Sequence, residues 1–169
     1  GAEGIVMTAS GCGVTVKEYG QLLSDDSLYA EKAKQISSVT WDVSEIVLKE
    51  SMASTLAGKG MRIAVQTPCT LQHGQGINGS IEKILSKLGF ELATVADAHM
   101  CCGSAGSYSI LQSSIAKSLR KDKLSALQAS EPAVIVTANI GCQVHLAAQS
   151  SVPVRHWIEL VDSVMSLNT

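Results

Sequence analysis

Short apolar runs alternate with segments of helical periodicity along most of this chain. The apolar runs are rich in β-branched residues, as buried strands are. They span residues 61–66, 90–95 and 133–137. The other segments repeat apolar residues every three or four positions, which predicts helices over 81–88, 108–129 and 157–165. Strands that alternate with helices in this way predict an α/β fold, with a mostly parallel sheet flanked by helices.

The beginning of the chain resembles its end, which indicates an internal repeat. The matched stretches are GIVMTASGCGVTV with VIVTANIGCQVHL, and WDVSEIV with RHWIELV. This alignment sets Cys12 against Cys142. We interpret residues 1–59 as the C-terminal end of a first cysteine-rich repeat and residues 60–169 as a complete second repeat. We expect the first segment to pack against the second, because it is too short to build a core of its own.

Composition and charge exclude several classes of protein. Apolar residues make up 46% of the chain and charged residues 17%, which is incompatible with disorder. The net charge of −2 argues against nucleic acid or an anionic membrane as the main partner. The longest uncharged run, residues 132–154, is too rich in polar residues to span a membrane. A basic cluster of Lys117, Arg120, Lys121 and Lys123 is interpreted as the solvated face of a helix, with a docking patch as the alternative.

The cysteine content points to thiol chemistry or metal binding. The chain has five cysteines, an odd number, and is too large and apolar to depend on disulfide bonds. No secretory signal peptide is recognisable before the first apolar run. These features predict a reducing, cytoplasmic location. The five residues are Cys12, Cys69, Cys101, Cys102 and Cys142.

Four of these cysteines follow three successive predicted strands. Cys69 follows the first, Cys101 and Cys102 the second, and Cys142 the third. The carboxyl ends of parallel strands meet at one edge, so we expect these four thiols within about 10 Å of one another, with Cys12 outside the group. Each lies in an uncharged stretch, which suits a multi-thiolate metal site because backbone N–H groups can bond the sulfurs without competing carboxylates. The alternative is that they are small buried residues of the core.

The order C…CCG…C, with a strand and Pro-Cys before it and N-x-G-C-x-x-H after it, resembles the cysteine-rich CCG domain family. That family includes B-type subunits of heterodisulfide reductases and iron–sulfur subunits of flavin-linked hydroxyacid and glycerol-3-phosphate dehydrogenases. The segments TPCTLQHGQG, CCGSAGSYSILQ, TANIGCQVHL and SGCGVTVKEYG are most similar to its glycolate oxidase type. The resemblance covers essentially the whole chain.

The resemblance implies an oxidoreductase subunit that takes electrons from a flavoprotein partner oxidising glycolate or a similar 2-hydroxy acid. The FAD would belong to the partner, and this chain alone is not expected to be catalytic. Cys69, Cys101, Cys102 and Cys142 would hold a four-iron (4Fe-4S) cluster, which is non-cubane in the B-type reductase subunits. Cys12 would be the remnant of the first repeat's site. The expected location is the cytoplasm, with the complex as a link to the inner face of the membrane.

The family motif ends in C-x-x-C, and this chain departs from it. The fourth position holds His145 after Cys142 and Thr15 after Cys12. His145 is a candidate fifth ligand through an imidazole nitrogen, because histidine replaces cysteine in some iron–sulfur centres. The alternative is an ordinary polar residue in the first turn of a helix. The cluster type therefore stays open at this point.

Two other functions compete with this interpretation. One is a structural zinc module, and an isolated fragment is expected to be apo or zinc-loaded after handling in air. The other is a thiol or nucleotide-dependent enzyme that uses Cys69, with His73 as its base, and the loop Gly74–Gly79. That loop reads GQGING, a G-x-G-x-x-G motif, but residues 67–73 separate its first glycine from the strand end. His99 and Tyr108 are weaker candidates for the same rim, whereas His156 is interpreted as a strand-end or cap residue.

The fragment is also expected to self-associate. A duplicated protein normally buries an apolar face of each half against the other. A chain that holds only part of one half should leave such surface exposed, and large exposed apolar patches mark association sites.

Overall fold

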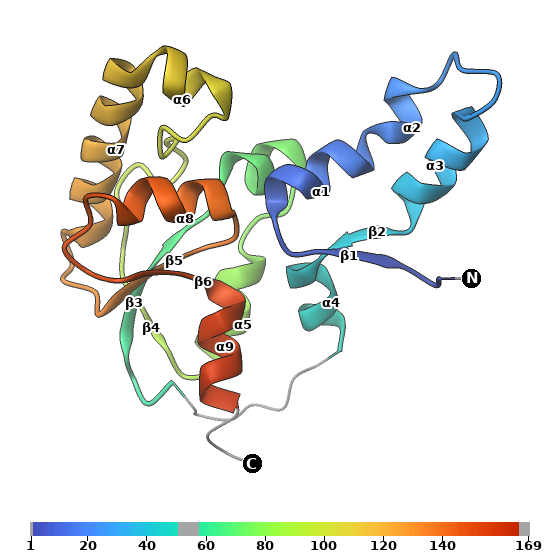
Figure 1. Ribbon diagram of the computed structural model, residues 1–169. Coiled ribbons are helices and arrows are strands. Elements are labelled where there is room, and N and C mark those ends of the chain that lie inside the picture. Colours follow the sequence, from blue (N-terminus) through green and yellow to red (C-terminus); the bar gives the residue numbers. More distant parts are fainter. Residues whose placement is uncertain (1, 51–57, 166–169) are drawn as a thin grey trace.

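The computed structural model describes residues 2–50 and 58–165. Its strands form two parallel sheets (Figure 1). The larger sheet has the order β4-β3-β5-β6, with every neighbouring pair parallel. Its strands are β3 (Arg62–Gln66), β4 (Glu91–Leu92), β5 (Val134–Thr137) and β6 (Val154–His156). The smaller sheet pairs β1 (Ile5–Met7) with β2 (Thr40–Asp42).

The three predicted strands lie in one parallel sheet, which confirms the expected fold class. The strand predicted over 90–95 is shorter than expected, since only Glu91 and Leu92 pair as β4. The amide of Ala93 donates once more to Ile63 O at 2.8 Å, and the chain then leaves this edge of the sheet. The edge strand β6 was not predicted, because its pairing with β5 is a long-range contact that a three-residue strand does not announce.

Helices cover both faces of the larger sheet. They are α5 (Ser80–Lys87), α6 (Ser107–Leu111), α7 (Ser113–Gln128), α8 (Ile140–Ala147) and α9 (Trp157–Met165). The predicted helices over 81–88 and 157–165 are confirmed. The single helix predicted over 108–129 is wrong, because the chain bends at Gln112 (φ −118°, ψ 51°). The bend lets α7 pack on the sheet while Ile110 on α6 stays 79% exposed.

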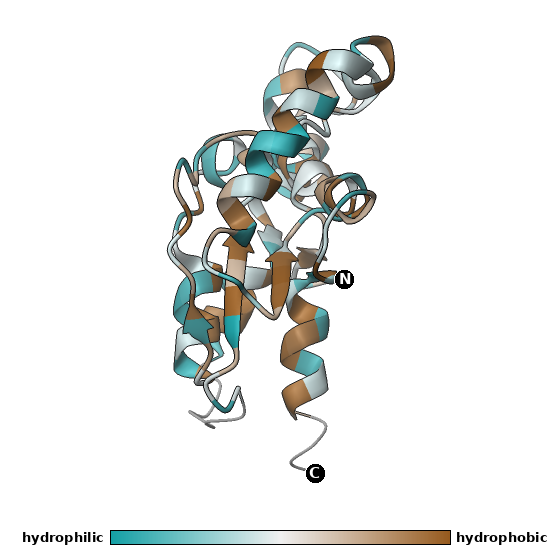
Figure 2. Cartoon of the chain, turned by 90° about the vertical axis from the view of Figure 1, so that its left-hand side faces the viewer, coloured by the Kyte–Doolittle hydropathy of each residue, from teal (hydrophilic) through white to brown (hydrophobic). Residues whose placement is uncertain are grey.

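Alternating residues of the central strands separate two apolar layers. Ile63 of β3 points to the side that α5 and α9 cover, where it joins Leu85 and Trp157. The next residue, Ala64, points to the other side, where it packs with residues of α7 and α8. Figure 2 shows the strands as brown arrows between these helices. The sheet is therefore sandwiched between two layers of helices.

The first segment forms a small unit that is joined to the larger one. Its helices are α1 (Ser10–Lys17), α2 (Tyr19–Leu22), α3 (Ala30–Ser38) and α4 (Val43–Lys49). The helices α2 and α3 pack together as an arm that extends away from the larger sheet (Figure 1). The amide of Ser10 donates to Ala138 O at 3.1 Å, and Val43 and Val47 of α4 pack on the core beneath α5. The expected packing of the first segment against the second is confirmed.

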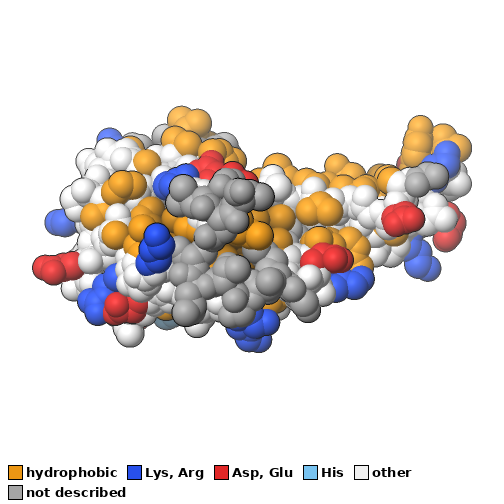
Figure 3. All heavy atoms as spheres, turned by 90° about the horizontal axis from the view of Figure 1, so that it is seen from below, with side chains coloured by type: hydrophobic (Ala, Val, Ile, Leu, Met, Phe, Trp, Pro, Cys, Tyr) orange, Lys and Arg blue, Asp and Glu red, His pale blue; other side chains and the backbone are white. Residues whose placement is uncertain are grey.

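The surface at the end of the molecule where the strands begin is mixed in character. Figure 3 views this end from below and shows charged side chains of both signs scattered among apolar ones. A pocket here is lined mainly by apolar side chains, including Met61, Pro153 and Leu160. None of the cysteines contributes to that lining. The cysteines of the second segment instead follow the carboxyl ends of the strands.

Candidate metal centre

Three loops at the carboxyl edge of the larger sheet carry the four cysteines of the second segment. Cys69 comes shortly after β3 and immediately precedes η1 (Thr70–Gly74), a π-helical turn. Cys101 and Cys102 lie in an irregular stretch between β4 and α6. Cys142 is the third residue of α8, which follows β5. Because β4, β3 and β5 are parallel neighbours, these loops open on the same edge.

The four thiols form one continuous chain of contacts. The Cys101 thiol lies close enough to the thiols of Cys69 and Cys102 to interact with both. The Sγ atoms of Cys102 and Cys142 lie 3.1 Å apart. All are free cysteines. The predicted convergence of these thiols at one rim is confirmed.

Burial increases along this chain of thiols. Cys69 and Cys101 are partly exposed, whereas Cys102 and Cys142 are 1% and 2% exposed. The centre therefore extends from the surface into the core. Cys12 lies exposed on α1 and takes no part in these contacts among the described residues. Its expected place outside the group is confirmed.

The glycine of the CCG motif is required by the backbone. Gly103 has φ +91°, and a Cβ atom built on it would lie 2.4 Å from Ala116 O of α7. Any other residue would be strained and would clash with that helix. This conformation also directs amides toward sulfur, since Gly103 N lies 3.4 Å from Cys101 Sγ and Ser104 N 3.4 Å from Cys102 Sγ. The loop thus supplies N–H donors to the thiols, as metal–thiolate sites require.

Burial and contacts among the thiols keep Cys69, Cys101 and Cys102 protonated when no metal is bound. The hydrogen bond to Cys102 and burial raise the pKa of Cys101. At Cys102 the bond from Cys101 favours the thiolate, but the Cys142 contact and burial outweigh it and raise the pKa to about 12. Burial, followed by the neighbouring Cys101, raises the pKa of Cys69. A bound metal would reverse this balance, because it deprotonates the thiols that coordinate it.

Two of the four basic residues on α7 are buried beside this centre. Lys117 and Lys121 are exposed, but Arg120 is 9% and Lys123 0% exposed. The interpretation of the whole cluster as a solvated face is therefore wrong for Arg120 and Lys123. Their positions belong to the buried stripe of α7, shared with Ala116, Leu124 and Leu127, and this spacing was a usable signal in the sequence.

His145 lies next to the CCG loop, but one of its ring nitrogens is already engaged. Its Nε2 donates to Ala116 O at 3.3 Å, which leaves Nδ1 as the nitrogen that could bind a metal. The position of a Cβ atom built on Gly103 is 3.1 Å from this Nε2. His145 is thus close enough to the thiol centre to be considered as a ligand.

The other candidates at the rim are outer residues. His73, His99 and Tyr108 are exposed. The amide nitrogen of Gln72 lies 2.9 Å from His73 Nε2 and donates to His99 O at 3.3 Å, so it ties the Cys69 turn to the loop before Cys101. Gln72, rather than Cys69, is the hydrogen-bond partner of His73. This arrangement does not form a Cys–His nucleophile pair.

The glycine-rich loop has a packing explanation. A Cβ atom built on Gly74 would lie 2.8 Å from Val14 Cγ2, because α1 packs against η1 at this point. Gly76 and Gly79 have φ values of +69° and +71°, which only glycine adopts at little cost. The loop therefore brings the chain from Cys69 to α5 beneath α1.

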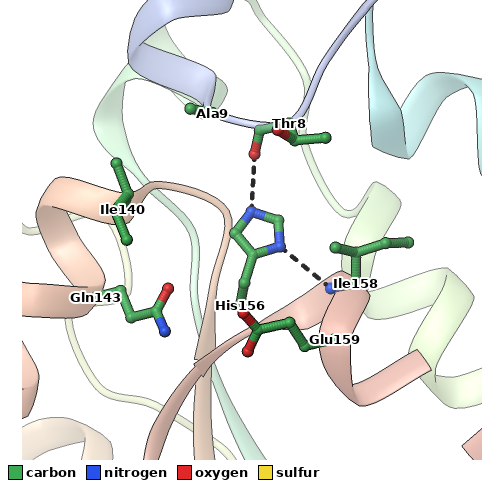
Figure 4. A pocket seen from close by; sticks show the side chains of 7 residues that line it. All are labelled: Thr8, Ala9, Ile140, Gln143, His156, Ile158 and Glu159. Carbon is green, nitrogen blue, oxygen red and sulfur yellow. Dashed lines mark hydrogen bonds between the residues drawn. The ribbon is translucent and has the colours of Figure 1, made fainter. Parts of the chain in front are cut away.

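A pocket next to the centre is a seam between the two segments (Figure 4). It is lined by Thr8, Ala9, Ile140, Gln143, His156, Ile158 and Glu159. His156 Nε2 donates to Thr8 O at 2.8 Å, and its Nδ1 accepts from Ile158 N at 3.3 Å. Both ring nitrogens are occupied, so His156 is the strand-end and cap residue that the sequence predicted.

The thiols would have to move apart to bind any metal. Two thiolates on one tetrahedral zinc lie about 3.8 Å apart, given Zn–S bonds of about 2.3 Å. The 3.1 Å separation of Cys102 and Cys142 is shorter. Within residues 2–50 and 58–165, no three Cys, His, Asp or Glu side chains are arranged to hold one ion. Four thiols along one rim, with backbone N–H donors and, in the described part of the chain, no carboxylate bonded to them, are nevertheless the chemical surroundings that an iron–sulfur cluster uses.

Comparison with known families agrees with this geometry. The model of the cysteine-rich domain named CCG matches residues 63–147, half of the chain. The chain belongs to this family. The matched region contains Cys69, the CCG motif, Cys142 and His145, and it leaves Cys12 outside.

Two relatives place the chain more narrowly. It is 49% identical over 165 residues to the glycolate oxidase iron-sulfur subunit of Escherichia coli K12, with 98% of this chain and 40% of that protein covered. It is 26% identical to lactate utilization protein A of Bacillus velezensis, with 96% and 71% covered. The chain thus spans less than half the length of the first relative. None of the helices in the described part of the chain has the length and apolar character needed to span a bilayer.

Proposed function

We propose that this chain is part of an iron–sulfur subunit that relays electrons from a flavoprotein oxidising glycolate or another 2-hydroxy acid. The observation that carries the proposal is the contact chain of Cys69, Cys101, Cys102 and Cys142, built from three loops at one sheet edge. Core packing requires no such convergence. The similarity to a glycolate oxidase iron-sulfur subunit supports the choice of partner and substrate class.

The four cysteines would hold a four-iron cluster, and the amides of Gly103 and Ser104 would bond its coordinating sulfurs. The bound cluster would supply one-electron transfer. His145 is the proposed fifth ligand, through Nδ1, because its Nε2 is committed to Ala116 O. Five ligands favour the non-cubane type known from the B-type reductase subunits. Replacement of His145 would then change the spectrum of the cluster without abolishing iron binding.

Hydride removal from the substrate would take place at FAD on a partner subunit, so the present chain would not be catalytic alone. Its own tasks would be cluster binding, electron relay and docking. We further assign residues 1–59 to the end of a first repeat and residues 60–169 to a complete second one. The reducing cytoplasm, at the inner face of the membrane through the complex, is the proposed location.

Anaerobic reconstitution with iron and sulfide tests the proposal. We expect the wild-type chain to take up about four irons and to show an electron paramagnetic resonance signal in one redox state. A matched control is the Cys12→Ser variant, which removes the exposed thiol and should bind the same amount of iron. No iron uptake would overturn the proposal, and one colourless Zn²⁺ bound tightly by the same thiols would favour a structural zinc module instead.

A further inference from the structure

Helix α7 carries two buried positive charges, Arg120 and Lys123, which we call the α7 cation pair. The ion pairs within the described chain are Lys17–Glu45, Arg62–Glu91 and Arg155–Glu159. The α7 cation pair thus has no carboxylate within ion-pair distance. Burying an uncompensated charge is costly, so some other negative group should balance it.

Backbone carbonyls hold both side chains in place. Lys123 Nζ donates to Ala98 O at 2.8 Å and to Asp97 O at 3.3 Å, in the loop that leads to the CCG motif. Arg120 donates from a terminal guanidinium nitrogen to His145 O at 3.3 Å, near the end of α8. Each cation therefore ties α7 to an element that carries candidate ligands. The carbonyls are neutral, however, and leave the two charges unbalanced.

The thiols of the candidate centre are the groups positioned to supply the balance. Cys101, Cys102 and Cys142 lie close enough to interact electrostatically with Lys123. The Asp97 carboxylate also interacts with Lys123, but Asp97 is exposed, and the hydrogen bond that it accepts from Lys123 is through its backbone carbonyl. The buried Nε of Arg120 has no hydrogen-bond partner. Protonated thiols carry no charge, whereas thiolates around a metal cluster do.

We propose, on the basis of the function proposed above, that the α7 cation pair is the built-in counter-charge of the thiolate cluster. Lys123 is its main member and a positioning residue, since it also holds the CCG loop. In a site of low dielectric constant, a fixed positive charge favours the more negative, reduced state of a cluster. Lys123 therefore raises the reduction potential of the centre and makes it a better electron acceptor.

The test compares variants of Lys123 in the reconstituted full chain. Lys123→Met removes the charge and keeps an unbranched side chain, Lys123→Arg keeps the charge, and Lys121→Met is the control at an exposed position of the same helix. We expect Lys123→Met to lower the equilibrium constant for one-electron reduction at least tenfold, a potential about 59 mV lower. Lys123→Arg and Lys121→Met should stay near wild type. Iron content and thermal unfolding of the apo chain are measured in parallel, because a purely structural role would lower these and leave the potential unchanged.

An iron-loaded Lys123→Met variant with the wild-type potential would overturn this inference and leave the proposed function intact. Wild-type chain that takes up no iron would overturn the proposed function, and this inference with it. If Lys123→Met does not fold, Lys123→Gln carries the test, because its side chain can still donate to Ala98 O without the charge. The same fall in potential is expected, and an unshifted potential in Lys123→Gln would then decide against the counter-charge.

Discussion

Helices α1 and α8 begin in the same way but differ in their surroundings. Each follows a strand of a parallel pair, and each carries a cysteine as its third residue, Cys12 in α1 and Cys142 in α8. Cys142 meets Cys102 at 3.1 Å, whereas Cys12 faces solvent. Residues 1–59 contain no other cysteine. A cysteine at a helix start is therefore not a site by itself, because the centre also needs the CCG loop and the Cys69 turn.

A strand-to-helix junction of the same kind occurs in both segments, with a different capping residue in each. Asp42 ends β2 and accepts from Ser44 N at 2.9 Å, two residues ahead in α4. His156 ends β6 and its Nδ1 accepts from Ile158 N at 3.3 Å, two residues ahead in α9. The same cap position supports the interpretation of the chain as parts of two repeats. His156 additionally donates to Thr8 O, so this cap residue also holds the first segment in place.

The largest difference in iron uptake is expected between variants of Cys142 and Cys12, the cysteines at corresponding positions of α8 and α1. Cys142→Ser should abolish most iron uptake in anaerobic reconstitution, because a serine hydroxyl is a poor substitute for a buried thiolate ligand. Cys12→Ser should retain the wild-type iron content. Iron and sulfide analysis of both proteins, with circular dichroism to verify folding, makes the measurement. Equal losses in the two variants would mean that Cys12 contributes to the same centre.

Substitution of the glycines near these cysteines should likewise cost more stability in the second segment than in the first. Gly103→Ala combines φ +91° with a contact of 2.4 Å to Ala116 O and should cost about 3 kcal/mol of unfolding free energy. The new methyl group of Gly13→Ala on α1 meets the Gln75 side-chain amide at 2.8 Å, which also donates to Ser10 O, and Met7 Cβ at 3.4 Å, but the substitution gains helix propensity. Its effect should stay within about 1 kcal/mol. Urea denaturation of the apo proteins measures both, and a tolerant Gly103 would contradict the account of the CCG loop.

The sequence predicted the positions of the thiols better than those of the residues that pack around them. Apolar periodicity is a local property, so it placed β3, β5 and α9, and parallel topology then placed Cys69 beside Cys142. The burial of Lys123 was missed because a charged residue counts as polar, although its long stem can lie in a buried stripe. The bend at Gln112 depends on what α6 and α7 pack against, and no local pattern in the chain encodes that.

Substitutions of the two capping residues at the strand–helix junctions should differ less in their cost to stability. His156→Ala removes a partner from both Thr8 O and Ile158 N and should cost about 2 kcal/mol. Asp42→Ala removes an ordinary N-cap, for about 1 kcal/mol. His99→Ala, at an exposed position, is the control and should be nearly neutral. Thermal or urea unfolding would reject the proposed seam role if His156→Ala were the mildest of the three.

The smallest effect is expected from the arm of the first segment. The second segment covers its core on both sheet faces, but Leu22 and Leu28 of the arm are 66% and 65% exposed. The chain spans 40% of its Escherichia coli relative, and large exposed apolar side chains favour association. We therefore expect weak self-association through the arm, seen as an apparent mass that rises with concentration in light scattering. Leu22→Glu should weaken it roughly tenfold, because a buried leucine side chain contributes about 1.5 kcal/mol or more. Ile110→Glu, on α6 beside the thiols, is the matched exposed control. If Ile110→Glu rather than Leu22→Glu dissolves the assembly, copies meet at the cysteine edge, and a mass that is monomeric at every concentration would refute self-association altogether.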